Sequence, residues 1–160
     1  MSELPEIKKF NIRVYGILIN ENNGILLSDE IFKGVMMTKF PGGGMDPGEG
    51  PEECLLREGQ EEFGQEIVII DHFYTTHFFQ RSLFYPDQQV ISIYYLIKFR
   101  GPAKIKISEK PFDFKGEADG TFSFRWAQLE KLSEDDITLP VDKYVVTLLK
   151  EKFKKKQNNS

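Results

Sequence analysis

The first part of the sequence alternates between short hydrophobic runs and turn-forming residues, a pattern typical of strands. Residues 10–20 are rich in β-branched and aromatic side chains, residues 21–24 form a polar turn that ends in glycine, and the apolar pattern resumes at 25–28. These three stretches predict a β-hairpin. Further strands are predicted in four places, at residues 35–40, 67–79, 89–100 and 121–126.

Two segments have the spacing of an amphipathic helix instead. The segment 51–63 begins with Pro51, which suits the first helical position, and stops before Gly64, a common C-terminal signal. The segment 141–155 repeats apolar residues every three or four positions. Two other regions are less regular, with a loop and some strand predicted at 102–120 and a short helical turn at 127–132. Strands outnumber helices, which predicts an α/β fold with a mixed sheet covered by helices on its two faces.

Length and charge limit the domain organisation and the class of partner. With 160 residues and no long linker, residues 1–160 are predicted to form one domain, with a short disordered basic tail from about residue 154. The formal net charge of −4 argues against a protein that holds nucleic acid through its phosphates. We interpret the basic run at 150–156 as a solvated helix end.

The cysteine content bears on the compartment. Cys54 is the single cysteine, so no intramolecular disulfide can form and a reducing compartment is expected. The first residues lack the basic and apolar regions of a secretory signal, and no apolar run reaches the length of a membrane span. The sequence therefore predicts a cytoplasmic protein without a membrane partner.

Three glutamates in the segment 51–63 break the local rules of helix stability. Glu58, Glu61 and Glu62 lie three and four residues apart, so they project from one side of the helix. The pair Glu58 and Glu62 places like charges on neighbouring turns, at a cost of ~0.2–0.5 kcal/mol. Gly59 adds about 1 kcal/mol relative to alanine. Local rules fail mainly where a functional site overrides them.

A hard divalent cation would remove this conflict, because Mg²⁺ prefers carboxylate and water oxygens and leaves positions for substrate phosphates. The preceding run Gly42-Gly43-Gly44 lets the backbone approach an anion or present a carbonyl to a metal. On these residues alone, an exposed acidic face explains the three glutamates equally well. The run lacks the Gly-Lys-Ser/Thr ending of a P-loop, which excludes that class of ATPase.

The spacing of these residues favours the metal site. Counting from Gly43, five residues precede Glu49, seven more precede Arg57, and the sequence then reads Arg-Glu-Gly-Gln-Glu-Glu-Phe-Gly. This arrangement resembles the Nudix box, written as Gly, five residues, Glu, seven residues, Arg-Glu-aliphatic-any-Glu-Glu-any-Gly-aliphatic. Gly59 and Gln65 replace aliphatic residues of that pattern, and both are packing positions rather than ligand positions.

The resemblance implies a Nudix-like α/β/α sandwich and a hydrolase in which metal-activated water attacks phosphorus in a nucleoside diphosphate linked to another moiety. The implied cofactor is Mg²⁺, with Mn²⁺ as a substitute. Carried over position by position, the resemblance implies Glu61 and Glu62 as the principal metal ligands, with a backbone carbonyl of Gly42 or Gly43 as an additional ligand. Glu58 is either a further ligand or the base that helps activate water, while Arg57 and Glu49 hold the constellation by charge-assisted hydrogen bonds.

Residues outside the box set the substrate, and here several assignments stay open. Arg13 and Tyr15 share one side of the first strand. They either meet the phosphate and base of a substrate or face outward from an edge strand. Glu117 is the candidate for a catalytic carboxylate from a later loop, with Asp119 and Glu109 as substitutes, and solvated loop acids explain all three as well.

Two alternatives to a nucleotide hydrolase are open. An isomerase of prenyl diphosphates uses the same scaffold, but that activity expects a cysteine before the box and none is present. A catalytically weak Nudix-like module that senses a ligand or binds a protein would usually lose box acids, which this chain retains. The expected partner is therefore a small nucleotide substrate, and a homodimer is compatible with the resemblance.

Overall fold

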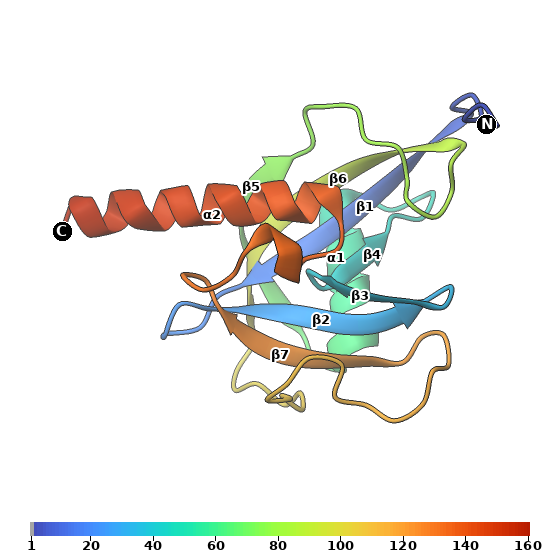
Figure 1. Cartoon of the computed structure of the whole chain (residues 1–160). Helices are drawn as coiled ribbons and strands as arrows, with labels where there is room; N and C mark the ends of the chain where they lie inside the picture. Colours follow the sequence, from blue (N-terminus) through green and yellow to red (C-terminus); the bar gives the residue numbers. More distant parts are fainter. Residues whose placement is uncertain (1) are drawn as a thin grey trace. The chain divides into compact units, whose positions relative to one another are not determined.

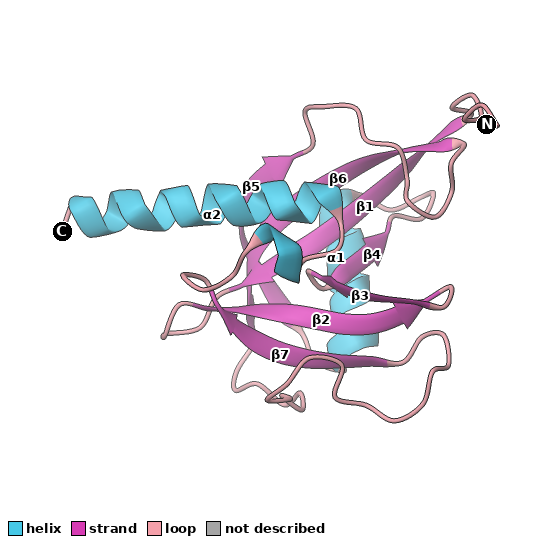
Figure 2. Ribbon diagram, in the orientation of Figure 1, coloured by secondary structure: helices cyan, strands magenta, loops and turns pink. Residues whose placement is uncertain are grey.

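The computed structural model describes residues 2–160, and Figures 1 and 2 show the order of its elements. The chain forms two compact units, each assembled from two separated stretches. Unit 1 contains the described residues up to Ile17 together with Pro41–Lys104, and unit 2 contains Leu18–Phe40 and Ile105–Ser160. No helix within residues 2–160 is long and apolar enough to cross a membrane.

A four-stranded mixed sheet with the order β4-β1-β6-β5 forms the frame of unit 1. Its strands are β1 (Lys9–Leu18), β4 (Gly42–Gly44), β5 (Ile67–Thr75) and β6 (Gln88–Phe99). β1 lies between two neighbours, so the alternative that places Arg13 and Tyr15 on an edge strand is wrong. β5 ends at Thr75 rather than at residue 79, and two register shifts interrupt its pairing with β6.

β4 forms in a stretch for which the sequence predicted only a loop. The register with β1 is antiparallel, with the pairs Gly42–Tyr15, Gly43–Val14 and Gly44–Arg13. Gly42 has a φ of 140°, and a Cβ atom there would lie 2.1 Å from the carbonyl oxygen of Val14. Gly42 can pair with β1 here because its bare backbone can come this close to that strand.

Helix α1 spans Pro51–Phe63, the range predicted from the sequence. Gly64 ends the helix in the left-handed conformation, with a φ of 61°. One face of α1 is buried and packs against β4 and β5; its buried residues are Cys54, Leu55, Gly59 and Phe63. Glu58 and Glu62 are half-buried at the border of this face, and Glu61 is exposed.

Packing explains both departures from the Nudix box. A Cβ atom on Gly59 would lie 3.0 Å from Cδ1 of Ile67, so the missing side chain makes room for that isoleucine. Gln65 is buried, and its side-chain amide donates to the carbonyl of Pro102 at 2.7 Å and accepts from the N–H of Lys104 at 2.9 Å. An aliphatic side chain at 65 would leave these two backbone groups without that partner.

Unit 2 contains a three-stranded antiparallel sheet with the order β3-β2-β7. Its strands are β2 (Gly24–Phe32), β3 (Val35–Lys39) and β7 (Phe122–Gln128). The hairpin predicted across residues 10–28 is wrong, because β2 pairs with β3 and β7. Among the described residues, one isolated bridge between Ile19 and Ile25 is what remains of that hairpin.

The C-terminal part of unit 2 is more helical than predicted. A 3₁₀ helix, η1 (Glu134–Asp136), precedes α2, which spans Pro140–Asn158. The buried apolar residues of α2 are Val141, Val145, Val146 and Leu149. Residues 154–158 continue the helix, so the predicted disordered tail is wrong over that stretch. The helical turn predicted at 127–132 is also wrong at its start, because β7 runs to Gln128.

A buried ion pair ties β2 to β7. Asp29 is fully buried, and one of its carboxylate oxygens accepts from Nε of Arg125 at 2.7 Å. Its other oxygen accepts from the hydroxyl of Thr38 at 2.6 Å, which adds β3 to the network. Because a buried carboxylate needs its partners, this network fixes the three strands in one register.

The ion pair leads to a stability prediction. We expect Arg125→Met to lower the free energy of unfolding by about 3 kcal/mol, because it leaves a buried carboxylate without its cation. The matched control is Arg100→Met, whose partner Glu66 lies 3.0 Å away but whose side chain is 67% exposed, so that loss should stay below ~1 kcal/mol. Urea unfolding measures both variants, and equal losses would contradict the prediction.

Candidate active site

The candidate site lies within unit 1, where β4, the turn that follows it and α1 come together. The chain folds this way locally because Pro51 begins a helix shortly after the glycine strand. The strand-turn-helix arrangement brings the start of the Nudix-like motif at Gly43 against the middle of α1. Backbone groups of the glycines thus face carboxylates of the helix.

Arg57 is the centre of the site. Its guanidinium donates to both carboxylate oxygens of Glu49, from Nε at 3.0 Å and from Nη2 at 2.6 Å. Nη2 also donates to the carbonyl of Gly44 at 3.0 Å. Nη1 donates to Glu58 at 3.1 Å and lies 3.4 Å from Glu61. One side chain therefore joins the glycine strand, the turn and the helix, and the pairing of Arg57 with Glu49 expected from the motif is present.

The ion pair with Arg57 shifts the acidity of Glu49. Hydrogen bonding by Arg57, together with the backbone N–H of Asp46, lowers the pKa of Glu49 to about 2. The same interaction raises the pKa of Arg57 above its usual range. Both groups are therefore fully charged over the whole physiological range, as a permanent positioning pair requires.

Glu58 and Glu62 lie against the glycine strand. A Cβ atom on Gly43 would lie 2.4 Å from a carboxylate oxygen of Glu58, so this glycine makes the space that Glu58 occupies. Glu62 accepts from the N–H of Gly42 at 3.2 Å. Of the three helix glutamates, these two are thus held beside a backbone that carries no side chains.

Glu61 takes a different position from the other two helix glutamates. Its side chain is 60% exposed and lies on the outer side of Arg57. Among residues 2–160, no group of three His, Cys, Asp or Glu side chains is placed to hold a metal ion. Glu58 and Glu62 both lie beside the glycine strand, Glu58 and Glu61 both contact Arg57, and the role of the three glutamates as metal ligands stays a prediction.

The donor atoms at the glycine strand fit a hard divalent cation. Carboxylate oxygens of Glu58 and Glu62 are close to the backbone of Gly43 and Gly42, and no side chain of the glycines obstructs a phosphate. Oxygen ligands of this kind suit Mg²⁺ and Mn²⁺ rather than a soft metal. The carbonyl of Gly44, by contrast, already accepts from Arg57.

Cys54 supports the site without a reactive thiol. It is fully buried, and its Sγ lies 3.5 Å from the carbonyl oxygen of Gly44. Burial, with the nearby charge of Glu49, raises the pKa of the thiol to about 12. A protonated thiol is a poor nucleophile, so Cys54 packs α1 against β4.

Arg13 and Tyr15 lie on β1 beside the glycine strand. Nε of Arg13 donates to the phenol oxygen of Tyr15 at 2.7 Å, and Nη1 lies 3.5 Å from the Cβ position of Gly44. Tyr15 is buried, with its ring 5.3 Å from that of Tyr94 on β6. Sequence reasoning missed Tyr94 and the role of the Gly44 carbonyl, because both depend on strand pairing that no local pattern reveals.

The later-loop acids belong to unit 2. Asp119 accepts from the N–H groups of Lys33 and Gly34 at 3.1 and 3.0 Å, so it caps a turn. Glu117 and Glu109 are exposed on the surface of that unit. Asp119 thus has a structural partner, and Glu117 stays a prediction as a catalytic group.

The comparison with known families now identifies the class of protein. The model of the NUDIX domain matches residues 9–149. The chain therefore belongs to the Nudix family, and the predicted enzyme class, a Nudix hydrolase acting on phosphoanhydride bonds, is confirmed.

The chain is similar to named phosphohydrolases and to solved structures. An 8-oxo-dGTP diphosphatase of Escherichia coli K12 is 30% identical over 146 residues, covering 90% of this chain and 98% of the relative. An RNA pyrophosphohydrolase of Nitratiruptor is 38% identical over 82 residues, covering 48% of this chain and 53% of the relative. The crystal structure of a MutT protein from Methanosarcina mazei superimposes with a TM-score of 0.60 at 24% identity, covering 94% of this chain and 96% of that one. The predicted α/β fold class is thereby confirmed.

The acidity of Glu49 leads to a pH prediction. A carboxyl with a lowered folded-state pKa contributes stability above its unfolded value of 4.5, and loses that contribution as the pH falls toward about 2. We expect Glu49→Gln to be less stable than the parent by a constant amount above about pH 5. The difference should shrink as the pH falls through 4 and 3.

Urea unfolding across this pH range measures the difference. Glu66→Gln serves as the control, because its exposed pair with Arg100 should contribute little at any pH. A difference for Glu49→Gln that stays unchanged down to pH 2 would show that Arg57 does not hold this carboxylate charged.

Proposed function

We propose that the chain is a metal-dependent pyrophosphohydrolase that cleaves a nucleoside diphosphate linked to another moiety. The observation that carries this proposal is the position of Glu58 and Glu62 against Gly43 and Gly42. Two carboxylates beside bare backbone leave room for a phosphate while supplying the negative charge that a divalent cation needs. An exposed acidic face would require no such close fit.

Glu58 and Glu62 would hold the metal, together with a carbonyl of Gly42 or Gly43. Glu61 would join them after its side chain turns away from Arg57. Mg²⁺ is the proposed ion, with Mn²⁺ as its substitute. When bound, such ions neutralise phosphate oxygens and lower the pKa of a coordinated water.

The remaining steps belong to the side chains of the chain itself. Glu58 either ligates the metal or accepts the proton of the attacking water. Arg57 and Glu49 act as positioning residues, because their hydrogen bonds fix the glycine strand relative to α1. Glu117 remains the proposed later-loop base, should Glu58 serve only as a ligand.

Arg13 is the proposed phosphate-binding residue on β1. Its guanidinium lies beside Gly44, one residue from the Gly43 backbone that faces Glu58. Tyr15 would orient the guanidinium through its hydrogen bond with Nε, leaving the Nη groups to donate to phosphate oxygens. This placement puts a cation beside the glycine strand, where its positive charge suits a bound anion.

A free nucleotide is the proposed substrate rather than a nucleic acid. Two named relatives act on 8-oxo-dGTP and on RNA, and both names describe cleavage at a phosphate chain. The net charge of −4 opposes the binding of a long polyanion and leaves a single nucleotide as the better match. The cytoplasm is the proposed compartment, because the one cysteine is buried and forms no disulfide.

A substrate screen tests the proposal directly. The panel contains 8-oxo-dGTP, the ordinary nucleoside triphosphates, ADP-ribose, dinucleoside polyphosphates, NADH, nucleotide sugars and RNA with a 5′-triphosphate, each with Mg²⁺ and a phosphate-release readout. We expect turnover of at least one free nucleotide and none without divalent metal. Turnover in EDTA would contradict the mechanism, and no turnover at all would favour the ligand-sensing module.

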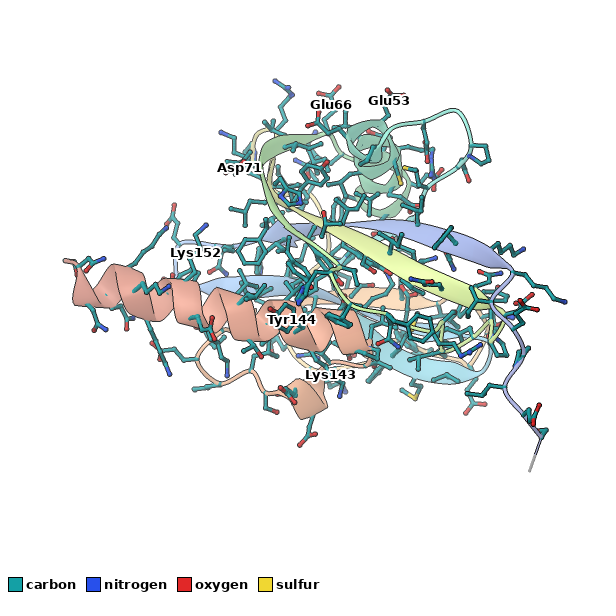
Figure 3. The ribbon with its side chains drawn as sticks, turned by 90° about the horizontal axis from the view of Figure 1, so that it is seen from above. Glu53, Glu66, Asp71, Lys143, Tyr144 and Lys152 are labelled. Atoms are coloured by element: carbon teal, nitrogen blue, oxygen red, sulfur yellow. The ribbon has the colours of Figure 1, made fainter. Side chains whose placement is uncertain are left out.

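Substitutions on α1 separate the ligands from other acids. Glu58→Gln and Glu62→Gln should each lower kcat/KM by about a hundredfold or more, because each removes a charge at the reacting phosphates. The matched control is Glu53→Gln on the first turn of the same helix, whose side chain points into solvent (Figure 3). A comparable loss for Glu53→Gln would show that the charge of the helix matters rather than its geometry.

The glycine strand gives an independent test by metal binding. We expect Gly43→Ala to raise the dissociation constant for Mn²⁺ about tenfold or more, because its Cβ atom displaces the Glu58 carboxylate. Gly44→Ala is the control, since its Cβ atom would meet only Arg13 at 3.5 Å, an ordinary contact. Electron paramagnetic resonance of free Mn²⁺ gives both constants, and equal values for the two variants would contradict the fit.

A further inference from the structure

Helix α2 continues past the point where it packs on the rest of unit 2. Its last buried residue is Leu149, yet the helix runs on to Asn158. The next positions on the same face, at helical spacing, are Lys150, Phe153 and Lys154. The face that is apolar in the first half of α2 thus becomes amphipathic in the second half.

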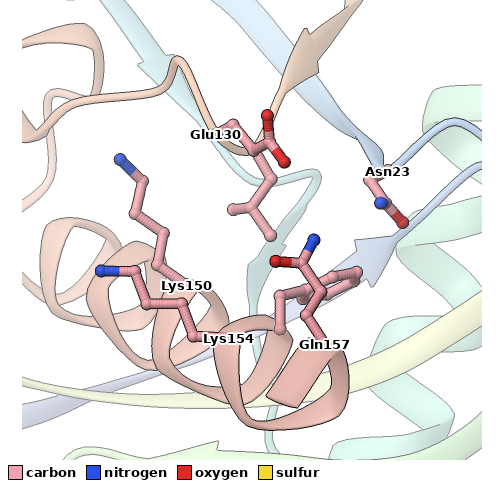
Figure 4. A pocket seen from close by; sticks show the side chains of 7 residues that line it. Asn23, Glu130, Lys150, Lys154 and Gln157 are labelled. Carbon is pink, nitrogen blue, oxygen red and sulfur yellow. The ribbon is translucent and has the colours of Figure 1, made fainter. Parts of the chain in front are cut away.

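A pocket of about 290 Å³ lies under these last turns. Figure 4 shows Lys150 and Lys154 extending side by side from α2, and Glu130, from the segment that follows β7, also lines the pocket. Leu129, which is buried, and Phe153, which is half-buried, supply the apolar part of the lining. Asn23 and Gln157 complete the rim with amide groups.

The charges of this pocket are separated rather than paired. Within the part of the chain that the structure describes, no hydrogen bond or ion pair involves the side chain of Lys150, Lys154 or Glu130. A ligand that carries both an anionic group and a hydrogen-bond donor can therefore bind the two lysines and Glu130 at the same time.

Lys150 and Lys154 suit the binding of a phosphate group. Lysine binds phosphate as a point charge, and two ammonium groups on adjacent helical turns match a phosphomonoester, which carries nearly two charges at neutral pH. The C-terminal end of a helix disfavours an anion, so without the lysines this place would repel one. Lys155 already complements the dipole from outside the pocket, which leaves Lys150 and Lys154 available to a ligand.

We propose that this pocket binds a mononucleotide. Lys150 and Lys154 hold the phosphate, Glu130 accepts from a hydroxyl or amino group, and Phe153 contacts the ring system. The volume of about 290 Å³ lies just below the ~300–1,000 Å³ range for ligand pockets, so a mononucleotide matches the pocket better than a dinucleotide. All the lining residues belong to unit 2, so this pocket shares no residue with the candidate active site of unit 1.

An NMR titration of the full ¹⁵N-labelled chain tests the proposal. Guanosine monophosphate, ribose 5-phosphate and inorganic phosphate are added separately in EDTA, so that no nucleotide is held through a metal in unit 1. We expect saturable shifts for the mononucleotide at the amides of Asn23, Glu130 and residues 150–157, with weaker binding of the other two. Absence of these shifts, or equal affinity for inorganic phosphate, would overturn the proposal.

Two matched lysine variants separate a built pocket from general attraction to a basic helix. Lys154→Gln should raise the dissociation constant about tenfold, as expected for loss of one charged hydrogen bond. Lys155→Gln removes the same charge one residue away without lining the pocket, and it should change the constant less than about twofold. Equal weakening by both variants would also overturn the proposal.

Discussion

The site depends on one guanidinium that holds two carboxylates and a carbonyl at once. Arg57 binds Glu49 through two hydrogen bonds, reaches the carbonyl of Gly44 and contacts Glu58. Without this cation the acids of α1 would repel one another, and the turn before the helix would lose its link to β4. Because Arg57 stays charged at any physiological pH, the arrangement exists before any ligand arrives. Glu58 and Glu62 are thus held beside the glycine strand in advance, while Glu61 would have to turn away from Arg57 to join them at a cation.

The backbone of the glycine strand is the second requirement. Gly42 approaches β1 too closely for any side chain, and Gly43 leaves the space in which Glu58 lies. The strand therefore joins the sheet on one side and the helix on the other. This double contact explains why the chain accepts the entropic cost of glycine at positions 42 and 43. Gly59 and Gln65 depart from the family pattern for the same kind of reason, since each satisfies a neighbour that an aliphatic side chain would not.

The parts of the structure that were predictable from sequence rest on local signals. Pro51 and Gly64 mark the ends of α1, and the spacing from Gly43 to Arg57 identifies the family. The rest depends on partners far along the chain. β4 exists because three glycines pair with β1, and the hairpin prediction failed because the partners of β2 are β3 and β7. The contact of the Glu61 side chain with Arg57 was likewise not predictable from sequence, because helical spacing gives the side of the helix on which a residue lies and not its side-chain rotamer.

The proposed divalent cation would lie between Glu58 and Glu62, against the glycine strand, and the location of that ion is the most direct test of the proposed site. Crystals grown with Mn²⁺ and a non-hydrolysable nucleoside triphosphate would reveal it as a peak in an anomalous difference map. The account predicts a peak at about 2.0–2.3 Å from carboxylate oxygens of both glutamates, with phosphate oxygens completing its coordination. A peak elsewhere on the molecule, or ordered nucleotide without metal at these residues, would contradict it.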